Sequence, residues 1–448
     1  GESRVRLILA AVFSAISIVT LLVPGSRVTF YIGYVLAMLV ALLLGPILAQ
    51  VLGRAIRPLL KFVRPVEGAL AADSLIQAPR RTSASVAALM LSLALVTAFA
   101  GMARASYNSI LDWVNGALNP DLFVSPSPDI VLRTLRFPSE MGEELAAMPG
   151  VARIQKVRNA RIMFRGRPVM IVSAEIASLA ETAPLPPVEG DALQMYRQTA
   201  SGQGLLISDN LARLDGLHAG DTIEIAAPHG TIALPVAGIV VDYSDQQGTI
   251  LMDRTVYGRY WHDDSVNIFR VYLARGADEP AVRAQILKRF AGERQVFVLT
   301  NREIREYILR ITDQWFALSS VQIAVAVFVA VLGIVNTLTV SITDRRRELG
   351  VLKAVGGLRG QIRQTIWMEA VSIGFLGLVL GFALGALNLY YILEIVERDI
   401  AGMRLDYVYP VMTTLALIPT ILAAAFVAAL WPAEAAVRGS LVEALEYE

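Results

Sequence analysis

Long stretches without a charged residue recur along the chain, separated by segments rich in charge. A helix that crosses a bilayer needs roughly 17 to 25 residues. Charge-free stretches of about this length occupy residues 7–23, 28–53, 82–103, 315–343, 370–393 and 408–433. The pattern therefore predicts six membrane spans, while each stretch taken alone also fits a buried helix of a soluble core.

Residues 104–314, between the third and fourth predicted spans, follow a different pattern. Apolar runs of strand length alternate there with helical ones, which predicts a mixed α+β domain. We expect strands at residues 121–125, 151–157, 167–176, 204–208, 220–243, 249–253 and 267–274, with a hairpin around 228–230. Helices are expected at 139–148 and 279–290, and an irregular insertion at 181–203, which is rich in Pro, Ala and Gly.

The end of this domain predicts a stalk that joins it to the fourth span. Four apolar residues fall on one stripe of a helix: Ile304, Ile308, Ile311 and Trp315. No Pro or Gly interrupts the chain from there into the span, so we predict one continuous helix that transmits movement. The alternative is a juxtamembrane helix broken at the interface. The charged residues of the stalk are predicted to form its solvated face: Glu303, Arg305, Glu306 and Arg310.

The distribution of basic residues predicts the orientation in the membrane. Residues 1–6, 54–81, 344–369 and 434–448 hold 15 Lys and Arg, whereas 24–27 and 394–410 hold three. Basic loops remain in the cytoplasm, so both termini are predicted to be cytoplasmic and residues 104–314 extracytoplasmic. The predicted fold class is an α-helical transmembrane bundle of six spans with a large extracytoplasmic α+β domain inserted between spans 3 and 4. A content of 55% hydrophobic residues agrees with a membrane protein.

These patterns divide the chain into eight segments. They are an extra transmembrane helix pair (1–53), a cytoplasmic amphipathic linker (54–81), span 3 (82–103), the extracytoplasmic domain with its stalk (104–314), span 4 (315–343), a cytoplasmic coupling segment (344–369), spans 5 and 6 (370–433) and a cytoplasmic tail (434–448).

The cytoplasmic segment after span 4 predicts a short amphipathic helix. Leu349, Leu352 and Val355 are spaced at three, Asp344 can cap the helix, and Gly356 can end it. Such a helix fits a groove on a partner protein, whereas a simple topological anchor would need only the arginines. The residues predicted to couple to the partner are Arg346, Arg347, Glu348, Leu349, Gly350, Leu352, Lys353, Ala354 and Gly356.

Patterns typical of catalysis are missing from the sequence, so we expect no catalytic, cofactor-binding or metal site and a chain that is not an enzyme. The chain has no Cys, and its three histidines, His218, His229 and His262, form no metal-binding motif. The glycines after the coupling helix are followed by no Lys-Ser or Lys-Thr pair, which excludes a Walker motif. The carboxylates of residues 242–253 are expected to be turn-forming and solvated.

Three stretches resemble the FtsX/MacB-type ABC transporter permeases. They are LAADSLIQAPRRTSASVAALML at 70–91, ITDRRRELGVLKAVGGLRGQIRQTIWMEAVSIGFLGLVLG at 342–381 and WPAEAAVRGSLVEALEYE at 431–448. The second carries the family's Arg-Glu-x-Gly-x-x-(Arg/Lys)-Ala-x-Gly helix at residues 347–356. The resemblance extends over roughly residues 68–448. It departs from the minimal four-span family member because an additional helix pair comes first.

The resemblance implies a permease subunit in a bacterial cytoplasmic (inner) membrane, driven by a separate cytoplasmic ABC ATPase dimer. It implies mechanotransmission that acts on lipids, lipoproteins or other amphiphiles outside the membrane. The alternative is a membrane-anchored receptor or regulator of envelope enzymes with FtsX-like signalling. The extra helix pair suggests that the sequence is the C-terminal module of a two-module, ten-span permease. The alternative is a complete six-span subunit that forms homodimers. Membrane lipids and an extracytoplasmic protein are further expected partners, and nucleic acid is not.

Overall fold

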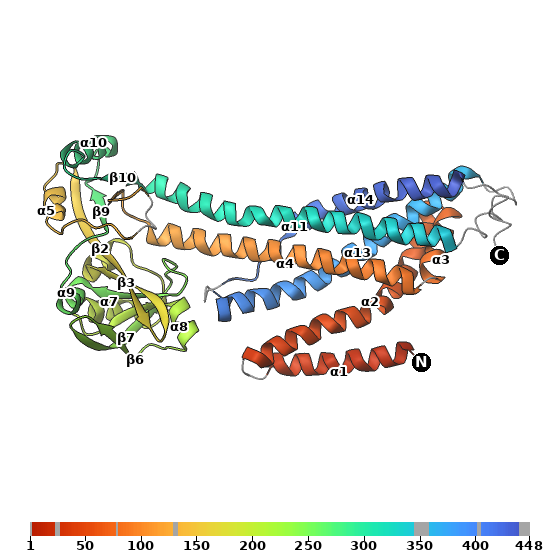
Figure 1. The fold of residues 1–448 in the computed structure, drawn as a ribbon, viewed down its shortest axis with the longest axis horizontal. Helices are drawn as coiled ribbons and strands as arrows, with labels where there is room; N and C mark the ends of the chain where they lie inside the picture. Colours follow the sequence, from red (N-terminus) through yellow and green to blue (C-terminus); the bar gives the residue numbers. More distant parts are fainter. Residues whose placement is uncertain are drawn as a thin grey trace. The chain divides into compact units, whose positions relative to one another are not determined.

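A computed structural model describes residues 2–22, 27–77, 79–128, 133–344, 358–400 and 405–438. The chain divides into two compact units, shown with their elements in Figure 1. The helical unit contains residues 1–104, 316–392 and 407–448, and the α/β unit contains residues 105–315 and 393–406.

Seven α-helices build the described part of the helical unit, three of which extend into the α/β unit: α4, α11 and α13. They are α1 (Glu2–Leu22), α2 (Arg27–Val63), α3 (Glu67–Gln77), α4 (Pro79–Ala117), α11 (Asn301–Asp344), α13 (Arg359–Ile395) and α14 (Val411–Arg438). Among the described residues, four helices are long and apolar enough to cross a membrane: Val28–Val63, Thr82–Gly116, Arg359–Arg398 and Val411–Val437. Of the other two predicted spans, the described part of 7–23 falls within α1 and 315–343 falls within α11, and both stay predictions as spans.

A row of glycines lets α4 and α13 approach closely. The three glycines recur every fourth residue of α13, on one face of the helix: Gly377, Gly381 and Gly385. A Cβ atom at each would lie 2.7 Å from the Cβ atom of an α4 residue, in turn Leu89, Leu93 and Thr97. Small residues at this spacing are typical of packed membrane helices because they let the backbones approach.

The extra helix pair, α1 and α2, is fastened to α13 by polar side chains. The Tyr34 hydroxyl donates to Oδ1 of Asn388 at 2.8 Å, and the hydroxyls of Ser17 and Tyr391 lie 3.3 Å apart. The Ser17 hydroxyl also donates to the Gly33 carbonyl at 2.9 Å, which links the pair to itself. Hydrogen bonds between helices stabilise membrane bundles, where water cannot replace them.

The predicted linker at 54–81 is largely helical. Helix α2 continues to Val63, and α3 follows. Ala71, Ala72 and Leu75 of α3 are buried, and Leu75 belongs to the apolar core of the helical unit. The segment therefore packs as part of the bundle.

One ten-stranded sheet organises the α/β unit. Its order is β10-β1-β9-β2-β3-β8-β5-β7-β4, and β6 pairs with β7. The strands are β1 (Leu122–Ser125), β2 (Val151–Phe164), β3 (Arg167–Ala174), β4 (Pro187–Glu189), β5 (Leu205–Ser208), β6 (Thr222–Ala227), β7 (Gly230–Val240), β8 (Thr249–Asp253), β9 (Ile268–Leu273) and β10 (Phe297–Thr300). Strand β2 pairs with β9 over residues 151–157 and with β3 over residues 158–164, so it belongs to both halves of the sheet.

Helices flank the strands of this unit (Figure 1). They are α5 (Met141–Ala146), α6 (Ile176–Thr182), α7 (Ala192–Ala200), α8 (Asp209–Asp215), α9 (Arg254–Trp261) and α10 (Glu279–Phe290), with the π-helix η1 (Val396–Ile400) from the segment after α13. The predicted hairpin is confirmed by antiparallel pairing of β6 with β7. The prediction of an irregular insertion at 181–203 is wrong, because β4 joins the sheet edge there and Asp191 caps α7.

Candidate functional site

The ends of α4 and α11 meet beside strand β1, and we call this meeting point the stalk junction (residues 110–123 and 299–308). Asn301, the first residue of α11, donates from its side-chain amide to the carbonyls of Leu118 at 2.6 Å and Pro120 at 2.8 Å. Its backbone N–H donates to the Asp121 carbonyl at 3.0 Å. One asparagine thus ties the start of α11 to the chain that leaves α4.

Arg305, one turn further along α11, adds a second set of hydrogen bonds between α11 and the end of α4. Its Nε donates to Oδ1 of Asn301 at 2.6 Å, and its Nη2 donates to the Leu118 carbonyl at 3.2 Å. Its Nη1 also contacts the amide oxygen of Asn115 on α4. The prediction that Arg305 belongs to a solvated face is therefore wrong, because this guanidinium bridges the two helices.

A capping box begins α11. The Glu303 N–H donates to the Thr300 hydroxyl at 3.1 Å, and the Thr300 N–H donates to Oε2 of Glu303 at 2.8 Å. Arg283 of α10 donates to the other oxygen of Glu303 at 3.0 Å. Burial alone would raise the pKa of Glu303, but the hydrogen bonds from Thr300 and Arg283 outweigh it and lower the pKa. The first turn of α11 is thereby fixed to the domain through β10 and α10.

Apolar side chains fill the junction beneath these hydrogen bonds. Ile304 is 1% exposed and packs with Val114, Leu118 and Phe123, while Ile308 lies at the edge of the same cluster. Two of the four predicted stalk residues thus contact the domain core. Ile311 is half-buried, and Trp315 continues the same helix with its side chain outside the described part.

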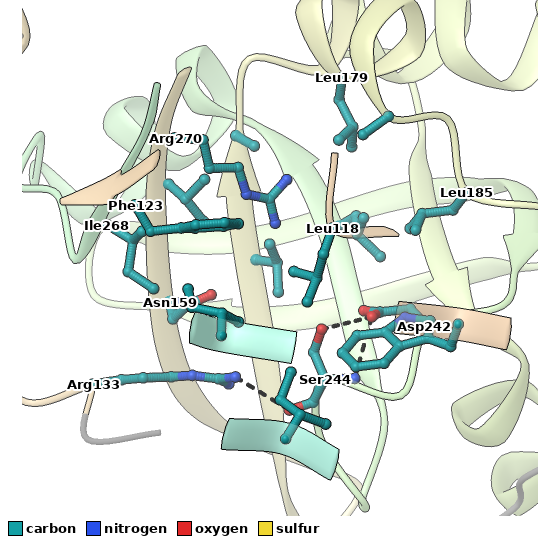
Figure 2. A pocket seen from close by; sticks show the side chains of 18 residues that line it. Leu118, Phe123, Arg133, Asn159, Leu179, Leu185, Asp242, Ser244, Ile268 and Arg270 are labelled. Carbon is teal, nitrogen blue, oxygen red and sulfur yellow. Dashed lines mark hydrogen bonds between the residues drawn. The ribbon is translucent and has the colours of Figure 1, made fainter. Parts of the chain in front are cut away.

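A cavity of about 110 Å³ adjoins the junction, and Figure 2 shows the side chains that line it. Its wall includes Trp113 from α4, Leu118 from the chain just after α4, and Ile304 and Ile308 from α11. Protein cores contain few voids larger than a water molecule. The cavity therefore leaves these side chains room to change position.

Charged groups face the same cavity from the sheet side. Asp242 is buried and accepts hydrogen bonds from the hydroxyls of Ser244 and Thr249, both at 2.6 Å (Figure 2 shows the first). Arg270 donates to the side chain of Gln155 at 3.2 Å, and burial lowers the pKa of Arg270. The prediction of solvated carboxylates is wrong for residues 242–253, where Asp242, Asp245 and Asp253 are all buried.

The segment after α13 makes a further contact with the α/β unit, which the sequence did not indicate. Glu397 of η1 forms an ion pair with Arg213 of α8. Arg213 also lies near the buried carboxyl of Asp209, where burial raises the pKa to about 6 against smaller opposing effects of Arg213 and the Asn210 N–H. The sequence of a charged turn after an apolar helix does not indicate which residue the turn will contact.

Other predicted site residues lie outside this junction. The nine coupling residues between Arg346 and Gly356 lie outside the described residues. The rings of His229 and His262, far apart in the sequence, stack at 3.8 Å in the α/β unit. In the described part of the chain, no cluster of three His, Asp or Glu side chains has the arrangement of a metal site.

Comparison with known proteins shows which families the chain resembles. Residues 82–289 match the MacB-like periplasmic core domain, and residues 320–441 match the FtsX-like permease C-terminal domain. An uncharacterized ABC transporter permease protein of Mycobacterium tuberculosis is 25% identical over 424 residues, which cover 93% of this chain and 49% of that protein. The macrolide export ATP-binding/permease protein MacB of Sodalis glossinidius is 28% identical over 258 residues, covering 56% of this chain and 36% of that protein.

The chain thus spans about half the length, or less, of these relatives. Among solved structures, the periplasmic region of MacB from Actinobacillus actinomycetemcomitans aligns with a TM-score of 0.33 at 11% identity, covering 44% of this chain and 97% of that one. Along this chain, the match to the periplasmic core domain precedes the match to the C-terminal permease domain. These matches confirm the predicted resemblance to the FtsX/MacB-type ABC transporter permeases.

Proposed function

We propose that the chain is the permease subunit of an ATP-driven transporter in the bacterial inner membrane and that it acts by mechanotransmission. A separate cytoplasmic ABC ATPase dimer hydrolyses ATP, and the extracytoplasmic domain moves in response. The work is done on lipids, lipoproteins or other amphiphiles outside the membrane. A second permease module, in the same chain or as a second copy, completes the bundle.

The observation that carries this proposal is the helix α11. It runs over 44 residues, and at a rise of about 1.5 Å per residue it is about 66 Å long. No proline interrupts it, and its first turn is fixed by the capping box and by Asn301 and Arg305. A stiff rod whose end is fixed in a folded domain moves that domain when its other end is displaced.

The segment that follows α11 is proposed to receive the force. We assign Leu349 and Leu352 as apolar anchors in a groove of the ATPase, and Glu348 with Arg346 and Arg347 as polar contacts at its rim. Gly350, Lys353 and Ala354 complete the proposed contact surface, and Gly356 ends the helix. Contacts at the centre of such an interface dominate binding, with truncations that cost roughly 2 kcal/mol or more, while rim contacts often cost less than about 1 kcal/mol.

The test is copurification of the ABC ATPase with two variants of the chain. Leu352→Asp should abolish copurification and the stimulation of ATP hydrolysis, because it introduces a charge into an apolar groove. Arg346→Ala should only weaken both, since it removes a rim contact. An ATPase that remains bound to and stimulated by the Leu352→Asp chain contradicts the coupling assignment and leaves this segment as a topological anchor.

A further inference from the structure

An open cleft of about 1,070 Å³ lies on the α/β unit where strand β2 changes partner from β9 to β3. Its floor includes residues 158–161 of β2, and its walls come from the 133–136 loop, the loop before β8 and the end of α9. Clefts of this size hold ligands of several hundred daltons. Neither the stalk junction nor the proposed coupling segment contributes a residue to it.

The cleft contains more arginines than carboxylates. Among the described residues, its lining includes four arginines, Arg133, Arg136, Arg158 and Arg161, and two acidic residues, Asp245 and Asp263. Arginines thus exceed carboxylates by two among the described residues of the lining. An excess of cations in a concave surface with few carboxylates favours an anionic ligand.

The ion pairs show which guanidiniums lack a carboxylate of their own. Arg136 and Arg158 share one oxygen of Asp263, at 3.3 Å and 2.9 Å, and Arg161 pairs with Asp245 at 2.6 Å. Arg133 donates to the Ser244 carbonyl at 3.2 Å, and no carboxylate of the described residues lies within ion-pair distance of it. Asp242, the other acidic residue near Arg133, lines the cavity at the junction and is bonded to hydroxyls.

Exposure shows which of these groups a ligand can reach. The Arg136 side chain is 51% exposed and that of Arg161 is 62% exposed, whereas Arg158 is 7% exposed. Arg158 is held by Asp263 and by the side chain of Asn267 at 2.9 Å, so it acts as a fixed charge below the cleft surface. Two exposed guanidiniums above a buried one can bind the oxygens of a single anion.

One side of the cleft offers an aromatic surface. Trp261 is half-buried and stacks on Tyr257 with ring centroids 4.7 Å apart, and the His262 ring follows it in the lining. Aromatic rings bind apolar or planar groups, while the arginines bind oxygen anions. The site therefore suits a ligand with an anionic group at one end and an apolar group at the other.

We propose that this cleft binds an organic phosphate monoester with an apolar portion. A dianionic monoester supplies two negative charges to a lining in which arginines outnumber carboxylates, whereas a carboxylate or a phosphate diester supplies one. Arg136 and Arg161 bind the phosphate oxygens, and Trp261 packs against the apolar portion. This binding does not depend on the transport function, because no residue of the cleft belongs to the stalk junction or the coupling segment.

Calorimetric titration of the full chain, purified in a non-ionic detergent, tests the proposal. The probes are inorganic phosphate, phenyl phosphate, dihexanoyl phosphatidic acid and benzoate. Phenyl phosphate or the phosphatidic acid should bind at least about tenfold more tightly than inorganic phosphate and benzoate. The tighter of the two shows whether the monoester comes from a soluble molecule or a lipid headgroup. The absence of binding by both monoesters, or equal binding of benzoate, overturns the proposal.

Charge variants with opposite expected effects separate binding from misfolding. Arg136→Gln removes an exposed guanidinium but leaves Asp263 paired with Arg158, and should weaken monoester binding about tenfold. Asp263→Asn keeps an acceptor for the Ser265 hydroxyl and should strengthen binding several-fold by removing a competing anion. Arg275→Gln, at an exposed position outside the cleft, is the matched control and should have no effect. Equal effects of Arg136→Gln and Arg275→Gln contradict the assignment.

Discussion

A Cβ atom added to Gly381 of α13 would lie 2.7 Å from the Cβ atom of Leu93 on α4. Real Cβ atoms almost never approach so closely, and the contacting atom is attached directly to the α4 backbone, so it cannot rotate away. The glycines before and after Gly381 in the same row face Leu89 and Thr97 in the same way. The three contacts together fix how α4 lies along α13.

Gly381→Ala is therefore expected to destabilise the helical unit by about 1–3 kcal/mol, the usual cost of overpacking a tight contact. The matched control is Gly333→Ala in α11, where an added Cβ would meet nothing within 4 Å and helix propensity favours alanine. Thermal inactivation of the two variants in detergent gives the comparison. Equal inactivation temperatures for Gly381→Ala and the unmodified chain would contradict the close contact between α4 and α13.

Ile308→Pro should uncouple ATP hydrolysis from movement of the extracytoplasmic domain. Proline removes a backbone hydrogen bond and kinks the helix, at a local cost of about 3 kcal/mol. The chain should still assemble with its ATPase, because residue 308 lies in the stalk and outside the apolar core of the helical unit. Transport and distance changes between spin labels in the domain are the readouts, with Ile308→Ala as the control that keeps the helix straight. Normal transport by a stably expressed Ile308→Pro chain would count against a rigid stalk.

Asn301→Ala should loosen the junction without breaking α11. The substitution removes hydrogen bonds to the Leu118 and Pro120 carbonyls and the acceptor for Arg305, which together should cost about 1–3 kcal/mol. Faster hydrogen exchange of residues 301–308 would report the loss. Arg302→Ala, which breaks only an exposed ion pair with Glu306, should leave exchange unchanged. Protection that is the same in both variants would contradict the role given to Asn301.

Stability of the α/β unit should fall as pH rises through the range in which Asp209 titrates. Burial raises the pKa of Asp209 from 3.8 to about 6, so in this window the folded chain binds more protons than the unfolded chain. The contribution of Asp209 to the free energy of unfolding is fully present below the unfolded-state pKa of 3.8 and is lost above the folded-state pKa of about 6. A difference of about two units corresponds to about 3 kcal/mol.

Asp209→Asn is therefore expected to raise the unfolding temperature at pH 8 and to change it little at pH 4. The Asn210 N–H donates to Oδ1 of Asp209 at 3.0 Å. This hydrogen bond is kept in the variant, because the side-chain oxygen of an asparagine can accept it as well. The control is Asp278→Asn at an exposed helix start without a side-chain cap bond. Parallel pH profiles for the Asp209 variant and the unmodified chain would show that this carboxyl does not titrate as described.

Local signals in the sequence were sufficient for much of the fold. Alternating apolar residues on both sides of His229 predicted the hairpin of β6 and β7, and the periodicity from Asn301 predicted an unbroken α11. The helix at 279–290 was also predicted with the observed bounds. In each case neighbours along the chain determine the structure.

Local sequence patterns did not predict the contacts between segments that are distant along the chain. Asp242 is buried because hydroxyls of Ser244 and Thr249 replace water around it, which the turn-rich sequence cannot reveal. Arg305 has the spacing of a solvated residue. It bridges the two helices only because the Asn115 side chain and the Leu118 carbonyl lie within hydrogen-bond distance of it. Strand β4 is three residues long and depends on its neighbour β7, so its sequence alone suggested a loop.

Strand β2 has a consequence for how the extracytoplasmic domain can be divided. Its first seven residues complete one half of the sheet and its last seven complete the other. Neither half keeps an intact edge if the backbone is cut between Val157 and Arg158. The two halves are therefore a single cooperative folding unit, and proteases or gene truncations should yield no stable half-domain. A twist of one half reaches the other through the covalent backbone of β2, so a molecule bound by Arg161 of this strand would sense it.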